Sequence, residues 1–123
     1  MQRVKESVTT EKSADAIFSM LKEIENAPKW SLLIQSVDKL ADGSCNANTR
    51  LGPLKFKWET DDAGKKCTLT ANILGTSYSA YYTVSVENGK TVITQDLPLN
   101  PMSTEEQIKD GIRQECQKMI ALV

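Results

Sequence analysis

The chain has 123 residues, enough for a single domain with its own hydrophobic core. Its 15 basic and 16 acidic residues leave a formal charge of -1, and no basic cluster is present that could bind nucleic-acid phosphates. The sequence contains no histidine, which excludes Ser-His and Cys-His nucleophile systems and histidine-ligated metal sites. We therefore expect one domain over residues 1–123 that uses neither a metal nor another cofactor.

The cysteines and the hydropathy pattern indicate the compartment. Cys45, Cys67 and Cys116 are odd in number and widely spaced, which is typical of small buried side chains and not of a disulfide framework or a zinc site. No run approaches the roughly 18 apolar residues of a transmembrane helix. The charged N-terminal residues do not resemble a signal peptide. The sequence thus predicts a cytoplasmic protein without a transmembrane segment.

The first part of the chain predicts a strand and then a helical segment. Residues 2–9 alternate between polar and apolar side chains, as a half-buried strand does. Ser13 offers a helix N-cap. An apolar stripe at helical spacing follows, made of Ala14, Ile17, Phe18, Leu21 and Ile24. Pro28 is expected to stop or redirect this helix, and Trp30 begins a short apolar segment.

From about residue 34 to residue 97 the period changes to two, which predicts six strands joined by hairpins. The turn signals are the run over residues 61–64 and, more strongly, the Asn88-Gly89 pair. In the last strand, Asp96 shares the parity of Val92, although Ile93 and Leu97 also allow the opposite register. This arrangement is typical of an antiparallel sheet.

The C-terminal segment predicts a long amphipathic helix. Ser103 and Glu106 have the spacing of a capping box. The apolar stripe consists of Ile108, Ile112, Cys116, Met119 and Val123. Gly111 interrupts this helix, either because another group approaches closely or because the position is exposed and tolerates glycine. Helices segregated from a hairpin-linked sheet define the α+β class, with the helices on one face.

Several segments along this order resemble the helix-grip fold of the START-like superfamily, which includes lipid-transfer domains and polyketide cyclases. The segments that carry the resemblance are 14–18 (ADAIF), 27–30 (APKW), 49–52 (TRLG), 89–92 (GKTV) and the terminal helix. Residues 51–55 (LGPLK) are also similar to the carbon monoxide dehydrogenase branch of this superfamily, although the chain lacks a glycine-rich stretch before its last helix. The resemblance implies a curved seven-stranded antiparallel sheet wrapped around the C-terminal helix, with a short helical segment between strands 1 and 2.

The same resemblance implies an apolar cavity between the sheet and the C-terminal helix, and so a small hydrophobic ligand such as a lipid, a quinone or a polyketide-like molecule. The alternation of the strands and the helical stripe supply the candidate ligand-binding residues. They are Leu54, Phe56, Trp58, Leu69, Ala71, Tyr78, Tyr82, Val84, Ile108, Ile112 and Met119. The alternative for each of them is a place in a filled core.

Four residues are candidates for acid–base chemistry: Tyr82, Glu6, Asp96 and Glu115. Glu6 shares the parity of the apolar residues in the first strand, and in helix-grip proteins the first and last strands are neighbours. Glu6 and Asp96 could therefore approach each other and separate their pKa values. The alternative is that both carboxylates lie in water.

Three functions follow as hypotheses. The first is binding of a small hydrophobic molecule without turnover, which the absence of histidine favours. The second is a polyketide cyclase or dehydratase-like enzyme, which would require a carboxylate or tyrosine in the cavity. The third is a protein-interaction module such as a chaperone activator, which would require Trp30 to lie exposed in an apolar patch.

Overall fold

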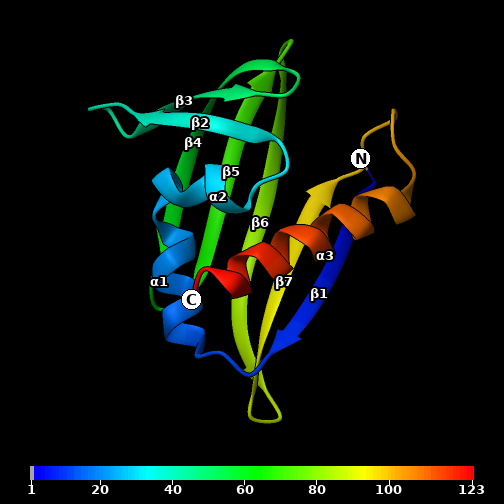
Figure 1. The fold of residues 1–123 in the computed structure, drawn as a ribbon. Helices are drawn as coiled ribbons and strands as arrows, with labels where there is room; N and C mark the ends of the chain where they lie inside the picture. Colours follow the sequence, from blue (N-terminus) through cyan, green and yellow to red (C-terminus); the bar gives the residue numbers. More distant parts are fainter. Residues whose placement is uncertain (1) are drawn as a thin grey trace.

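The computed structural model describes residues 2–123. Seven strands and three α-helices follow in chain order, with one short 3-10 helix between α1 and α2 (Figure 1). Their bounds are β1 (Arg3–Thr10), α1 (Ala14–Lys22), η1 (Ile24–Asn26), α2 (Ala27–Trp30), β2 (Ile34–Lys39), β3 (Ser44–Thr49), β4 (Gly52–Asp61), β5 (Lys66–Ile73), β6 (Thr76–Glu87), β7 (Lys90–Pro98) and α3 (Glu105–Ala121).

The strands form one antiparallel sheet in the order β1-β7-β6-β5-β4-β3-β2. Figure 1 shows α3 running alongside β7 and β1, with α1 and α2 packed further across the sheet. Because α1 contacts both β6 and α3, the helices share one face of the sheet. The predicted α+β helix-grip arrangement is confirmed, including the helical segment between the first two strands.

Local sequence signals explain where several elements begin and turn. The Ser13 hydroxyl caps α1 by accepting a hydrogen bond from the Ala16 backbone N–H at 3.3 Å. Pro28 lies in the first turn of α2, where proline fits because its missing N–H would have no helical partner. Asn88 and Gly89 both have positive φ, as the hairpin turn between β6 and β7 requires.

The capping box of α3 lies one residue later than the sequence predicted. Thr104, not Ser103, is the N-cap, and its hydroxyl accepts from the Gln107 N–H at 3.1 Å. The Gln107 side chain in turn accepts from the Thr104 N–H at 2.9 Å. Two overlapping Ser/Thr-x-x-Glu/Gln patterns are present, and the backbone turn that precedes Thr104 selects the second one.

The core lies between the sheet and the helices, and the three cysteines are buried in it with free thiols. Burial raises the pKa of Cys67 and of Cys116 to about 12, so both thiols are neutral and unreactive. No helix formed by residues 2–123 combines the length and the apolar character needed to cross a membrane.

Candidate ligand-binding cavity

An apolar cavity of about 490 Å³ lies at one end of the sheet, bounded by β4 to β7, the start of α3 and the segment between β7 and α3. Its lining residues are Leu33, Leu54, Leu69, Ala71, Ile73, Tyr78, Ser79, Ala80, Leu97, Pro98, Leu99, Asn100, Pro101, Ser103 and Ile108. Five of the eleven residues that the sequence singled out for ligand binding are among them, namely Leu54, Leu69, Ala71, Tyr78 and Ile108.

The other six candidates lie outside this lining. Phe56, Tyr82, Ile112 and Met119 are buried in the core. Trp58 is partly buried, and its indole N–H donates a hydrogen bond to the Lys22 carbonyl at 2.9 Å. Val84 is buried near the opposite end of β6. The inward-facing residues of the sheet therefore form two groups. One group is packed in a filled core, and the other lines the open cavity, which we call the open half of the sheet.

The open half results from small side chains and from a loop. Ala71 on β5 and Ala80 on β6 occupy inward positions of neighbouring strands, so the space between the sheet and α3 is not filled there. Sequence reasoning missed the lining residues Leu33, Ile73 and Ser79, and it also missed Ala80 and, Met102 apart, the residues of the segment 97–103. Alanine at two inward positions and prolines at residues 98 and 101 were the signals that could have indicated Ala80 and this segment.

Few polar groups face the cavity. Tyr78, Ser79, Asn100 and Ser103 are its polar lining residues, and Tyr78 is the only titratable one among the lining residues described above. Such a site can enclose apolar surface and orient it with a few hydrogen bonds. These lining residues offer no carboxylate for general acid–base work.

A buried polar cluster lies deeper, beneath the second half of α3. The carboxylate of Glu115 accepts a hydrogen bond from the Leu32 backbone N–H at 2.8 Å, and burial raises the pKa of Glu115 above its usual value. Burial, together with the negative charge of Glu115, also raises the pKa of Tyr82 far above its usual range. These groups tie α3 to the segment that follows α2, and neither of them lines the cavity.

Gln95 is part of the same cluster. Its side chain is fully buried, and its amide nitrogen donates to the Cys116 sulfur at 3.8 Å. Its Oε1 atom and the indole N–H of Trp30 have no hydrogen-bond partner among residues 2–123. Sequence reasoning missed Gln95 because it assigned β7 no single inward register.

The expected approach of Glu6 and Asp96 is wrong, because the two carboxylates lie on opposite faces of the sheet. β1 and β7 are neighbours, but Glu6 is opposite Gln95, and Asp96 is opposite Lys5. Successive side chains of a strand point to opposite faces of the sheet. Asp96 directly follows Gln95, the partner of Glu6, so the side chains of Glu6 and Asp96 point to opposite faces. Glu6 binds Arg113 of α3 at 3.0 Å, whereas Asp96 binds Arg3 at 2.7 Å.

Trp30 is buried, with 1% of its surface exposed, so the exposed position that an interaction module would require is not found. Its ring packs edge-on against Tyr82, with the ring centroids 5.7 Å apart. Trp30 therefore belongs to the core under α3.

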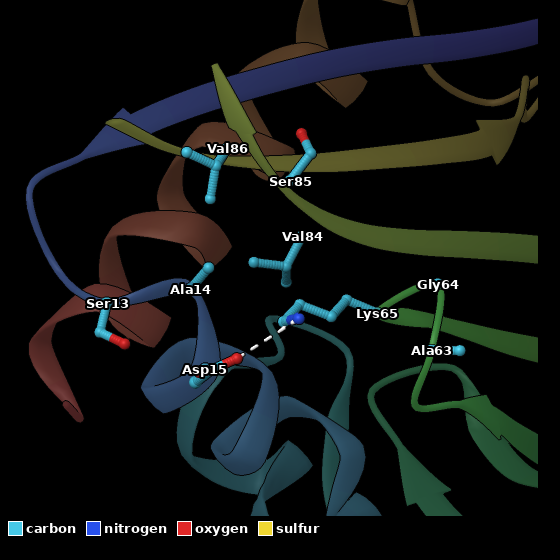
Figure 2. Close-up of a pocket in the computed structure, with 9 residues that line it drawn as sticks. All are labelled: Ser13, Ala14, Asp15, Ala63, Gly64, Lys65, Val84, Ser85 and Val86. Carbon is cyan, nitrogen blue, oxygen red and sulfur yellow. Dashed lines mark ion pairs between the residues drawn. The ribbon is translucent and has the colours of Figure 1, made fainter. Parts of the chain in front are cut away.

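A second hollow, of about 410 Å³, lies near the start of α1 and the turn between β4 and β5. Figure 2 shows that Lys65 reaches across it to Asp15, with 3.3 Å between the ammonium nitrogen and the carboxylate oxygen. Ala14, Ala63, Val84 and Val86 supply its apolar part. This ion pair is part of the lining, which within residues 2–123 contains no further charged group.

Solved structures with this arrangement are numerous, whereas no family model and no curated protein matches the sequence. The di-domain ARO/CYC BexL from the BE-7585A biosynthetic pathway superposes with a TM-score of 0.75 at 13% identity, over 97% of this chain and 45% of that chain. An uncharacterised protein from Bacillus thuringiensis superposes with a TM-score of 0.74 at 11% identity, over 96% of both chains. A START superfamily protein from Mycobacterium smegmatis gives 0.68 at 14% identity, over 97% of this chain and 92% of that chain.

Sequence identities this low define the fold alone. The protein has the START-like helix-grip fold, as the resemblance in its sequence predicted. The similarity to the carbon monoxide dehydrogenase branch stays a prediction. This fold hosts both binding proteins and enzymes, so function has to be argued from the cavity.

Proposed function

We propose that the protein binds a small hydrophobic molecule in the cavity between β4–β7 and α3. The observation that carries this proposal is an apolar space of about 490 Å³ lined by side chains of four neighbouring strands and one helix. Its volume lies within the roughly 300–1,000 Å³ typical of small-molecule sites. A lipid tail, a quinone or a polyketide-like molecule would replace water along this surface, and burial of apolar area would supply the affinity.

The composition of the lining supports binding without turnover over a cyclase-like reaction. The four candidates for acid–base chemistry lie outside the lining, and the hydroxyl of Tyr78 is the only titratable group among the lining residues. That hydroxyl can orient a ligand oxygen by a hydrogen bond. The name of one structural neighbour, the di-domain ARO/CYC BexL from a biosynthetic pathway, supports polyketide-like molecules as one class of ligand to test.

The test compares the binding of a neutral fluorescent probe, N-phenyl-1-naphthylamine, to the parent chain and to a variant whose cavity is filled. Ala80 lines the cavity on β6, so Ala80→Trp should lower probe affinity at least tenfold, because the indole would occupy the space. The matched control is Ala41→Trp in the exposed turn between β2 and β3, which should bind the probe as the parent chain does.

Folding of each variant is checked by thermal unfolding, and Ala80→Leu provides a milder change at the same position. Equal probe binding by folded Ala80→Trp and the parent chain would contradict the proposal. Native mass spectrometry of the purified protein then identifies a bound lipid or quinone by its mass.

A further inference from the structure

The exposed apolar side chains of the protein are concentrated around the mouth of the cavity. Seven large hydrophobic side chains are exposed within residues 2–123, and five of them surround this opening. We call these five the apolar rim: Leu33, Leu51, Ile73, Leu74 and Met102. The other two, Val86 and Leu122, lie elsewhere.

Contacts and sheet register bring the rim together. Leu33 and Ile73 line the cavity themselves, and Met102 lies between two lining residues. The backbone N–H of Arg50 donates to the Leu33 carbonyl at 3.0 Å, which holds Leu51 near Leu33. β4 and β5 are antiparallel and pair from Phe56 opposite Ala71 to Asp61 opposite Lys66, so the β3–β4 and β5–β6 turns lie toward the same end of the sheet (Figure 1).

Leu74 is the most informative member of the rim, because its conformation is unfavourable for leucine. Leu74 and Gly75 form the two-residue turn between β5 and β6, with φ of 52° and 83°. Asn88 and Gly89 form the corresponding turn between β6 and β7, with nearly the same angles, 52° and 76°. Asparagine is a preferred residue in this conformation, whereas leucine is strained there.

Leu74 is also fully exposed, so it contributes no core contact that would offset the strain. The same chain uses the favourable Asn-Gly turn at the other end of β6. A strained and exposed leucine at the tip of a turn indicates that its side chain contacts another molecule.

The rim fits a lipid surface better than a protein partner. Its five side chains lie in or beside four separate connections, α2–β2, β3–β4, β5–β6 and β7–α3, and fall far short of the roughly 20–30 residues that each partner contributes to a stable protein interface. A bilayer adapts to projecting side chains and accepts them singly. The charges near the rim do not oppose such a contact: Glu105 pairs with Lys109, and Arg50 makes none of the ion pairs found within residues 2–123.

We propose that the apolar rim inserts into the surface of a lipid bilayer, with Leu74 as the leading anchor. The mouth of the cavity would then face the apolar part of the bilayer. This orientation would let an apolar ligand pass between the bilayer and the cavity without crossing water. This last step rests on the proposed function, since it requires that the cavity binds such a ligand.

The test is co-sedimentation with phosphatidylcholine vesicles. Leu74→Asn should lower the vesicle partition coefficient about tenfold, because one buried leucine side chain is lost. The same substitution should raise the unfolding midpoint by about 3–6 °C, because it removes the strain of the turn. This combination of greater stability and weaker binding separates docking from a folding defect.

The matched control is Asn88→Leu, which creates an equally strained and exposed leucine at the opposite end of β6. We expect it to lower the unfolding midpoint and to leave vesicle partition unchanged. Partition of the parent chain should persist in 0.5 M NaCl, since apolar contact and not charge drives it.

Equal partition of Leu74→Asn and the parent chain, or no partition of the parent chain, would overturn the proposal. The proposed function is tested separately, by the neutral probe in the absence of vesicles. Probe binding without vesicle partition would refute docking alone, and vesicle partition without probe binding would refute the ligand site alone.

Discussion

Gly111 shows how the surroundings of one residue predict what its substitution does to the free energy of unfolding. It lies in the interior of α3, and a Cβ atom added there would be 3.8 Å from Cδ1 of Leu32, an ordinary van der Waals contact. Leu32 lies beside this position but leaves room for a methyl group, so no close approach requires a glycine here. Glycine is thus conformationally costly at a site that accepts alanine.

We expect Gly111→Ala to raise the free energy of unfolding by about 0.5–1 kcal/mol, measured by urea denaturation. Gly89→Ala provides the contrast, because Gly89 has a φ of 76° and alanine would be strained there. Its free energy of unfolding should fall. A decrease for Gly111→Ala would show that α3 and the segment around Leu32 pack more tightly than the 3.8 Å contact indicates.

At the level of single residues, sequence reasoning failed where apolar side chains occur on both faces of a strand. Val92 and Ile93 are consecutive and both buried, so the alternation in β7 does not specify which parity faces α3. In the structure, the side chains of Ile93 and Gln95 lie on the inner face of the sheet, and the side chain of Asp96 lies on the outer face. A buried glutamine also contradicts the general preference of this residue for the surface, which is why no pattern indicated it.

At the level of the secondary-structure elements, helix α3 has two adjacent residues that could serve as its N-cap, Ser103 and Thr104. Thr104→Ala should lower the free energy of unfolding by about 1 kcal/mol, because it removes the hydroxyl that accepts a hydrogen bond from the Gln107 backbone N–H. Ser103→Ala removes a hydroxyl that makes no cap bond to α3 and should have a much smaller effect. Urea unfolding of the two variants measures the difference, and a larger loss for Ser103→Ala would assign the cap to the residue that the sequence indicated.

The strands and the long helix could be predicted because each has its own local signal. Period-two alternation and the turn signals at residues 61–64 and 88–89 mark ends of the four long strands β4 to β7. The turn at Leu74-Gly75 carries no comparable signal, since leucine is atypical there. The short helix α2 could not be predicted as a separate element, because Pro28 can either end one helix or begin the next.

For the molecule as a whole, Glu115 connects α3 to the segment after α2, and it should make stability depend on pH. Burial raises its pKa above the usual value of 4.5, although the Leu32 N–H favours the charged form. A carboxyl with a raised pKa binds its proton more tightly in the folded state than in the unfolded state. Its contribution to stability is therefore full below pH 4.5 and is lost as the pH rises through the folded-state pKa.

We expect Glu115→Gln to remove this dependence. The free energy of unfolding, measured by urea denaturation from about pH 4 to pH 8, should decline less for Glu115→Gln than for the parent chain as the pH rises. The exposed Glu59 on β4 provides the control, and Glu59→Gln should give a profile parallel to that of the parent. Parallel profiles for Glu115→Gln and the parent would contradict the assignment.

The order of the strands and the existence of a cavity depended on the resemblance and not on local pattern. Alternation tells which side chains point inward, but not how far the opposing layer lies from them. Ile112 and Leu69 both carry the inward signal, yet the first fills the core and the second lines the cavity. The difference is set by α1, α2 and the segment 97–103, which cover the sheet unevenly.

The pairing of β1 with β7 has a consequence for synthesis on the ribosome. The residues of β1 find their sheet partners about 80 positions or more later in the chain, and α3, which also covers β1, follows later still. At translation rates of about 5–20 residues per second, β1 waits for at least about 4 s without its neighbour. During that interval the hairpins β2 to β6 can already pair, so the first strand to be made is among the last to join the sheet.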